Sequence, residues 1–267
     1  MCQTKNLSIV QKNKRLYFFL IICLFCLKVT AQDTLLNAVG IKYDITLSDK
    51  ATLKPWHLLS TEYIRKINKS SIIARLNYAH RFGLSDAQAE VDAYPVLSRK
   101  VYAYLNAGVA PGKKLFPRFR TGLSLFFVLP AKFETEGGIR YLNFNAPIHI
   151  YTASIGKYYK KYWFNLSTFL SPVNSNISSS FFLKSRYYFN DTDFAMLLLG
   201  TGLSPDNTVD NTLLNTFLKS KKVELSLRKH VSKQLIFLMN MGLSKQQISQ
   251  ASSINQYNFG VGLQQQF

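Results

Sequence analysis

The chain has 267 residues, of which 47% are apolar and 14% aromatic, and this apolar share excludes a disordered or low-complexity protein. It carries 33 Lys and Arg against 14 Asp and Glu, a formal net charge of +19. All three cysteines, Cys2, Cys23 and Cys26, lie close to the N-terminus, which argues against a disulfide scaffold, a cysteine-ligated zinc site or a catalytic thiol in the rest of the chain. We expect no cofactor and no metal site.

Segment 1–31 has the pattern of a secretory signal peptide. Three basic residues, Lys12, Lys14 and Arg15, precede twelve apolar residues at 16–27, and a short segment then ends in Ala31. A helix of that length spans about 18 Å, too short for a hydrocarbon core of about 30 Å. We therefore predict a leader at 1–31 and a domain at 32–267, which keeps a net charge of +14.

Beyond the leader, apolar and polar residues alternate with a period of two, which is typical of strands. In segment 39–47, for example, Ile41 and Tyr43 fall on one face while Lys42 and Asp44 fall on the other. Counting such segments gives about fourteen, separated by short turn signals, and we expect every connection to be a hairpin. The longest irregular stretch, 204–215, is predicted to be an extracellular loop. The clearest further segments are 72–78, 101–109, 119–127, 133–141, 162–170, 181–189, 223–227 and 257–263.

The length of these segments favours a membrane protein. Many run for nine to thirteen residues, whereas strands of soluble proteins average about five or six. One face is apolar and the other carries charged and amide side chains, which in a bacterial outer-membrane barrel become the lipid-facing wall and the lumen. We therefore predict an all-β fold, an antiparallel transmembrane β-barrel of 12 to 14 strands. A secreted soluble β-sandwich is the alternative.

The last predicted strand has the form of an outer-membrane assembly signal. Phe259, Val261 and Leu263 alternate toward a terminal Phe267. We therefore expect the barrel assembly machinery, outer-membrane lipids and lipopolysaccharide as partners, the last through lysines in turns. Aromatic clusters at 158–159, 162–163 and 187–189 are expected to form girdles at the membrane interfaces. No nucleic-acid-binding motif occurs, so we expect no nucleic-acid partner.

Several short motifs resemble the YaiO family of outer-membrane β-barrel proteins. They are spread over the chain and include Asp92-Ala93-Tyr94-Pro95, Phe116-Pro117-Arg118, Gly138-Ile139-Arg140-Tyr141-Leu142 and Arg186-Tyr187-Tyr188-Phe189. The resemblance covers about residues 35–267. It implies an outer-membrane location and a barrel without the helical repeats that precede it in some relatives, and it brings no established biochemical activity with it.

The charged residues on the predicted inner face are the candidate functional residues. In a packed lumen these charges would pair, because an unpaired buried charge costs several kcal/mol. In a water-filled lumen the arginines would select anions. We prefer the packed network, since small barrels are usually filled by side chains, and keep the pore as the alternative. The residues are Arg75, Glu90, Asp92, Arg118, Arg120, Glu134, Glu136, Arg140 and Arg186.

Three functions are compatible with this pattern. We expect first a non-enzymatic envelope protein whose loops or lumen bind a glycan or an anionic envelope component. The alternative is a narrow outer-membrane channel that passes an anionic solute or a sugar. The second alternative is a lipid-modifying enzyme built on His80 or His149, with Ser85 beyond a turn. We expect no enzyme, because no Gly-x-Ser-x-Gly elbow or His-Glu-x-x-His motif occurs.

Overall fold

The computed structural model describes residues 36–50, 53–112, 114–144, 146–173, 176–202, 220–249 and 252–267. The predicted leader and the predicted loop 204–215 lie outside the described residues. In the described part of the chain, no helix is long and apolar enough to cross a membrane.

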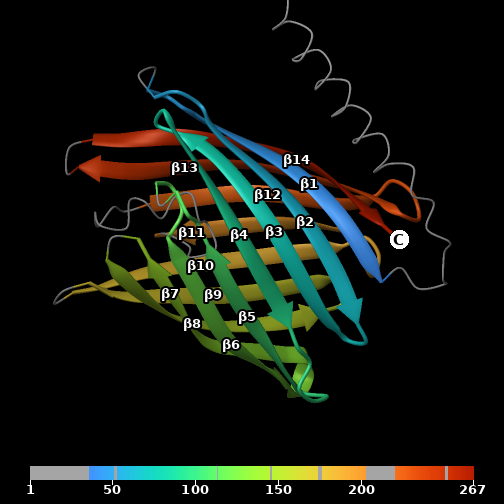
Figure 1. Ribbon diagram of the computed structural model, residues 1–267. Helices are drawn as coiled ribbons and strands as arrows, with labels where there is room; N and C mark the ends of the chain where they lie inside the picture. Colours follow the sequence, from blue (N-terminus) through green and yellow to red (C-terminus); the bar gives the residue numbers. More distant parts are fainter. Residues whose placement is uncertain are drawn as a thin grey trace, which may run out of the picture. The chain divides into compact units, whose positions relative to one another are not determined.

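Fourteen antiparallel strands close into a barrel in which each strand pairs with its neighbours in the sequence (Figure 1). A short 3-10 helix, η1 (Pro130–Lys132), connects two of them. The prediction of 12 to 14 strands, all joined as hairpins, is confirmed. The strands are β1 (Asn37–Ser48), β2 (Trp56–Ile67), β3 (Ser70–Arg81), β4 (Leu84–Tyr94), β5 (Val101–Val109), β6 (Phe119–Leu129), β7 (Phe133–Asn143), β8 (Pro147–Tyr159), β9 (Tyr162–Val173), β10 (Asn176–Tyr188), β11 (Phe194–Thr201), β12 (Ser220–His230), β13 (Leu235–Ser249) and β14 (Ser252–Gln266).

The polarity of the barrel is the reverse of that of a soluble protein. Outward side chains are apolar and exposed, as shown by Leu76 at 63% and Val261 at 53%. Many inward side chains are polar and buried, as shown by Gln88 at 1% and Ser124 at 0%. A smaller apolar cluster also faces inward and consists of Leu142, Ile150, Phe169 and Phe182. Because side chains alternate along a strand, the period of two in the sequence produces both the apolar outer face and the inner face. An apolar exterior of this extent is suited to a lipid bilayer.

The two ends of the barrel differ in their connections. At the end where β1 begins and β14 ends, which we call the terminal end, the connections are short and include the turn 160–161. At the opposite end, which we call the loop end, the connections include segment 110–118 and the stretch between β11 and β12. Short turns on one side and long loops on the other are the usual arrangement of outer-membrane barrels.

The barrel is closed by β1 and β14, which are paired from Ala38↔Gln266 to Ser48↔Gln256 (Figure 1). Inside this seam, the amide of Asn240 on β13 donates to the Asp44 carboxylate on β1 at 3.1 Å. Closure leaves no strand edge without a partner, which a sheet in a hydrocarbon environment requires.

Candidate functional site: the barrel lumen

The lumen is built by the inward positions of the strands, which carry most of the charged side chains of the barrel wall. Even-numbered positions point inward on β4 to β8 and on β10 to β12, and odd-numbered positions point inward on β3 and β9. The register places these residues side by side on neighbouring strands, as in the pairs Glu62↔Arg75 and Arg75↔Glu90. All of the predicted inner-face residues except Arg118 therefore lie around one interior.

One side of this interior, formed by β2 to β7, is held by ion pairs, and we call it the ion-pair wall. Arg75 Nη1 lies 2.6 Å from Glu90 Oε1 and 3.2 Å from Asp92 Oδ2, and its Nε lies 3.5 Å from Glu62 Oε2. Arg120 Nη1 lies 3.4 Å from Glu90 Oε2. One arginine thus contacts carboxylates from both neighbouring strands, and a second arginine, only 3% exposed, shares one of these carboxylates.

A second cluster of the ion-pair wall lies on β6 and β7. Arg140 Nη2 lies 3.6 Å from Glu136 Oε1, which also accepts a hydrogen bond from the Ser124 hydroxyl at 2.7 Å. The guanidinium of Arg140 sits 4.5 Å from the centre of the Tyr104 ring, a cation–π contact. Glu134 accepts a hydrogen bond from the Tyr102 hydroxyl at 2.9 Å. The carboxylates of this wall are therefore all engaged.

The opposite side of the lumen carries cations that lie in no direct ion pair, and we call Lys184, Arg186 and Arg228 the cationic wall. Within the described ranges, none of the three makes an ion pair. Arg228 instead donates to Gln264 Oε1 at 3.0 Å. The neighbouring Lys222 is paired with Glu224 at 2.9 Å. The positive charge of this side is thus carried by two residues of β10 and one residue of β12.

Arg186 lies in an aromatic environment that the sequence pattern did not predict. Its guanidinium carbon lies 4.1 Å from the centre of the Phe194 ring and 4.9 Å from that of Trp163, and it donates to the Tyr188 hydroxyl at 3.0 Å. The sequence predicts that all members of the aromatic clusters at 158–159, 162–163 and 187–189 lie at the membrane interface. Only their outward members are placed to meet lipid, because neighbouring residues of a strand point to opposite faces. The outward members are Tyr159, Tyr162, Tyr187 and Phe189, and the inward ones are Tyr158, Trp163 and Tyr188.

The lumen contains three adjoining cavities rather than a continuous packed core. The first, of about 400 Å³, reaches the loop end at Gly202 and Ser220. The second, of about 360 Å³, lies against the ion-pair wall and extends to Phe126 and Trp163 toward the terminal end. Lys184 lines both. The third, of about 330 Å³, shares lining residues with each of the others, so the three cavities are neighbours in one interior.

Segment 110–118 narrows the lumen at the loop end. The Asp86 carboxylate on β4 accepts hydrogen bonds from the backbone N–H groups of Lys114, Leu115 and Phe116 at 2.8, 2.9 and 3.1 Å. Leu115 and Phe116 are 1% and 0% exposed and pack against Ala79 on the inner face of β3. The segment is therefore folded into the barrel mouth and held there by one carboxylate.

Arg118 is the one predicted lumen residue that the structure places elsewhere. It precedes β6, and its side chain is exposed. The prediction assumed that Arg118, two residues before the inward Arg120, shares its strand and therefore its face. The chain is still in segment 110–118 at this point, and β6 begins only at Phe119. The eight other predicted charges do lie on the inner face of the barrel.

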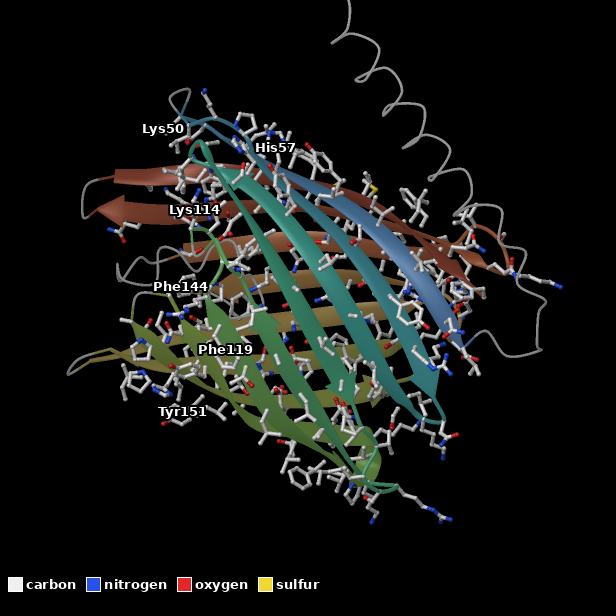
Figure 2. All side chains as sticks on the ribbon, in the orientation of Figure 1. Lys50, His57, Lys114, Phe119, Phe144 and Tyr151 are labelled. Atoms are coloured by element: carbon white, nitrogen blue, oxygen red, sulfur yellow. The ribbon has the colours of Figure 1, made fainter. Side chains whose placement is uncertain are left out.

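His80 and His149, the histidines considered for catalysis, lie on the outer wall, as does His57, which Figure 2 shows near the loop end. His80 Nδ1 lies 2.9 Å from Ser85 Oγ, so the structure brings this pair together. Ser85 Oγ also accepts a hydrogen bond from the Tyr78 hydroxyl at 3.1 Å. His149 packs against Tyr141 with ring centres 5.2 Å apart. Among the described residues, no group of three or more His, Cys, Asp or Glu side chains is arranged to hold a metal ion.

The predicted assembly signal lies on the outer face of β14. Phe259, Val261 and Leu263 are exposed at 47%, 53% and 47%, and Phe267 follows the end of the strand. The recognition of these residues by other proteins stays a prediction.

A carboxylate at the terminal end, outside the strands, has a shifted pKa. Asp193 is 1% exposed, and this burial alone would raise its pKa. The side chain and backbone N–H of His230, the Lys229 ammonium 3.1 Å away and the Asn190 amide stabilise the charged form. These contacts outweigh burial and hold the pKa of Asp193 well below its usual range.

Comparison with known proteins identifies the barrel. The family model described as the YaiO membrane beta barrel domain matches residues 36–207. No curated protein sequence matches the chain. Several solved structures share the fold. One named CymD monoaromatic hydrocarbon channel is 7% identical with a TM-score of 0.56, and 87% of this chain and 88% of that chain are covered.

Two further solved structures show the same fold. A bacterial polysaccharide outer membrane secretin is 12% identical with a TM-score of 0.53, covering 88% of this chain and 100% of that one. The outer membrane protein Omp33 of Acinetobacter baumannii is 9% identical with a TM-score of 0.53, covering 87% of this chain and 99% of that one. At this identity the likeness concerns the fold alone, which is that of outer-membrane barrels.

Proposed function

This chain belongs to the YaiO membrane beta barrel family, and from that premise we propose that it forms a narrow outer-membrane channel for small polar solutes, with a preference for anions. The observation that carries the proposal is Lys184, which lines both the cavity at the loop end and the cavity along the ion-pair wall. A solute that moved between these cavities would pass this ammonium group.

The charge balance of the lumen supports anion preference. On the ion-pair wall, Arg75, Arg120 and Arg140 are each paired with a carboxylate and so carry no free positive charge, and the acidic residues are concentrated on this side of the lumen. The cationic wall keeps its charge in the part of the chain that the structure describes. Because a narrow, partly dehydrated pore screens charge poorly, a few uncompensated cations are enough to raise the local concentration of anions.

The nature of the lumen also bears on the class of solute. The similar structure CymD is named a channel for monoaromatic hydrocarbons, which are apolar. The cavity along the ion-pair wall of this barrel is lined instead mostly by charged and polar side chains, including Asn165 and Ser154. Apolar side chains such as Phe169 and Phe182 line only part of the cavity at the loop end. Many of the polar groups already bond to one another, as Asn165 does to Ser154, and a water molecule or a hydrated solute can use their remaining donors and acceptors, whereas a hydrocarbon cannot. We therefore assign polar solutes to this channel.

The proposed channel has a defined orientation in the outer membrane and reaches this membrane by export and assembly. The loop end faces the exterior and the terminal end the periplasm, as is usual when both strand termini lie on the short-turn side. Export by the leader at 1–31, and assembly through the C-terminal strand by the barrel assembly machinery, belong to the same proposal.

The test is the ionic selectivity of the purified protein in planar lipid bilayers under a salt gradient. A difference in gel mobility between unheated and heated samples confirms that the barrel has formed. We expect discrete conductance steps with anion preference. Lys184→Glu should reduce or reverse the selectivity, because it replaces a positive charge with a negative one at the junction of two cavities. Arg120 is a poor probe, since it is tied to Glu90.

The matched control is Lys233→Glu, which makes the same change of charge at an exposed lysine of the turn between β12 and β13. It should retain the selectivity of the unaltered protein. Absence of conductance from a correctly folded barrel would contradict the proposal and would favour a closed lumen whose ligand is a glycan or an anionic envelope component.

A further inference from the structure

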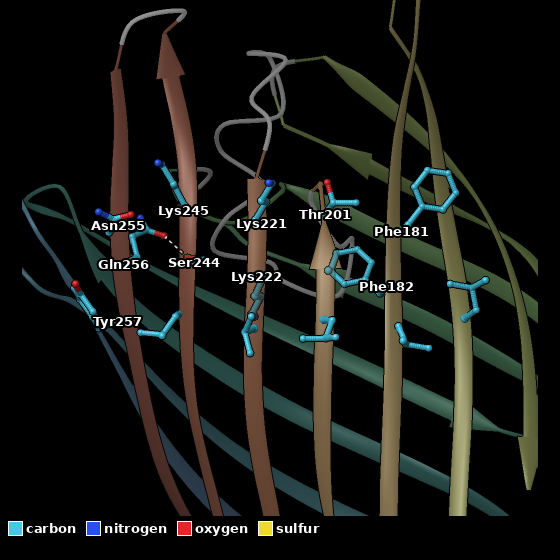
Figure 3. Close-up of a pocket in the computed structure, with 16 residues that line it drawn as sticks. Phe181, Phe182, Thr201, Lys221, Lys222, Ser244, Lys245, Asn255, Gln256 and Tyr257 are labelled. Carbon is cyan, nitrogen blue, oxygen red and sulfur yellow. Dashed lines mark hydrogen bonds between the residues drawn. The ribbon is translucent and has the colours of Figure 1, made fainter.

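The outer wall carries a pair of lysines that the channel does not require. Lys221 on β12 and Lys245 on β13 are direct partners in the strand register and both point outward near the loop end (Figure 3). Directly opposite residues on neighbouring strands have Cβ atoms about 5 Å apart, and like charges at that spacing destabilise the sheet. The pair is therefore an unfavourable arrangement unless an anion lies between the two ammonium groups.

The surroundings of the pair do not neutralise it. Neither lysine makes an ion pair with any residue in the described ranges. Their other neighbours in the register are neutral, Thr201 beside Lys221 and Asn255 beside Lys245. The Asp49 carboxylate in the nearby β1–β2 connection is already engaged by the side-chain and backbone N–H groups of Asn255, at 2.7 and 3.1 Å.

An apolar depression continues from the lysines along the outer wall. It has a volume of about 630 Å³. From Lys221 toward the terminal end, the next outward residue of β12 is Val223, and from Lys245 the next on β13 is Leu243, which are 46% and 56% exposed. Figure 3 shows Phe181 and Tyr257 bordering the depression on either side. The other outward residues lining it are Leu166, Leu183 and Leu199.

Two cations above an apolar groove are complementary to an amphiphile with an anionic head. A free phosphate would use the lysines and leave the groove without a role. A neutral lipid would use the groove and leave the lysines unpaired. A membrane phosphate meeting lysines at this depth is stabilised by charge, and acyl chains lying along the wall are stabilised by apolar contact.

We propose that this surface, formed by Lys221, Lys245 and the apolar depression between β9 and β14, binds a phosphorylated glycolipid of the outer leaflet, the lipid A part of lipopolysaccharide. The phosphate lies between the two ammonium groups and the acyl chains lie in the depression. This lipid binding rests on the proposed orientation, with the loop end facing the exterior, and not on conduction through the lumen. We therefore expect the barrel to bind the lipid even if it does not conduct ions.

The test compares binding of purified lipopolysaccharide to the detergent-solubilised barrel, measured as lipid adducts by native mass spectrometry and as lipid retained after gel filtration. Each phosphate contact of a lysine near the membrane surface strengthens binding about fivefold, so Lys221→Gln with Lys245→Gln should weaken it about 25-fold. Lys221→Arg with Lys245→Arg should retain it. Removing the phosphates from the lipid should weaken binding to the unaltered protein to a similar extent.

The matched control is Lys157→Gln with Lys233→Gln, two exposed lysines toward the terminal end. It alters the net charge by the same amount and should bind as the unaltered protein does. Heat-modifiable gel mobility verifies that each variant folds. Equal binding by the Lys221/Lys245 variant and the unaltered protein would overturn the proposal. So would an equal loss in the control variant, or binding that does not depend on the lipid phosphates.

Discussion

Removing the Asp86 carboxylate should release segment 110–118 from the barrel mouth. In Asp86→Ala, the backbone N–H groups of Lys114, Leu115 and Phe116 lose their common acceptor. A hydrogen bond to a charged group contributes about 1.5 to 3 kcal/mol net. Three donors that share one oxygen do not add fully, so we take a total of about 3 kcal/mol, which is about two orders of magnitude in the opening equilibrium of the segment.

The segment should loosen rather than leave the barrel permanently. Phe116 and Leu115 remain buried against Ala79, and each fully buried side chain of this kind contributes about 1.5 to 3 kcal/mol. This apolar term exceeds the lost hydrogen-bond term, so the closed state remains the major one. Asp86→Asn keeps an acceptor oxygen but loses the charge, and we expect an effect between those of the unaltered protein and Asp86→Ala.

The assay uses trypsin, because the side chain of Lys114 is exposed while its backbone is held by Asp86. Cleavage after Lys114 requires local opening, so its rate follows the open population. We expect cleavage about 100-fold faster in Asp86→Ala, at unchanged heat-modifiable mobility. Asp191→Ala, at an exposed carboxylate of the β10–β11 turn, is the control. An unchanged rate in Asp86→Ala would refute the role assigned to the carboxylate.

Two further predictions concern the barrel wall and the terminal end. In Gly138→Ala the new methyl group would lie 2.5 Å from the Leu123 carbonyl oxygen, so we expect the free energy of unfolding, measured in urea, to fall by about 1 to 3 kcal/mol. The control is Gly137→Ala, whose methyl group would meet nothing within 4 Å and which should leave the stability unchanged. Equal losses of stability in the two variants would contradict the prediction. Because the folded pKa of Asp193 is lowered, the stability that this carboxylate confers is complete above its unfolded pKa of about 3.9 and is lost as pH falls through the folded pKa. The difference in urea midpoint between the unaltered protein and Asp193→Asn should therefore be largest near pH 7 and shrink below about pH 4, and a difference that does not depend on pH would contradict the assignment.

The fold could be predicted from the sequence because a strand repeats with a period of two. Once Arg75 and Asn77 are placed on one face of a segment, every other residue of that segment is placed as well. The same rule identified the inner face of β6 from Arg120 onward. It failed at Arg118, because alternation holds only within a strand and β6 begins at Phe119.

The details of the candidate site depend on neighbours that are distant in the sequence. The aromatic surroundings of Arg186 come from Trp163 on β9 and Phe194 on β11, and the pairing of strands is needed to bring them together. The role of Asp86 is of the same kind, because segment 110–118, which it binds, follows the next strand along the chain and has no regular pattern. Such contacts are set by the pairing of strands in the closed barrel and not by the alternation of residues within one strand.

The seam between the first and last strands has a consequence for biosynthesis. Thr46 on β1 and Asn258 on β14 are 212 residues apart, yet their side chains are joined by a hydrogen bond of 3.2 Å. The first strand, β1, therefore cannot complete its pairing until the last strand, β14, has been synthesised. Bringing together two strands so far apart in the sequence is entropically costly and slow. A stop codon just before β14 would remove a single strand but would leave β1 and β13 each with an open edge. In this architecture a late truncation should be as damaging as an early one.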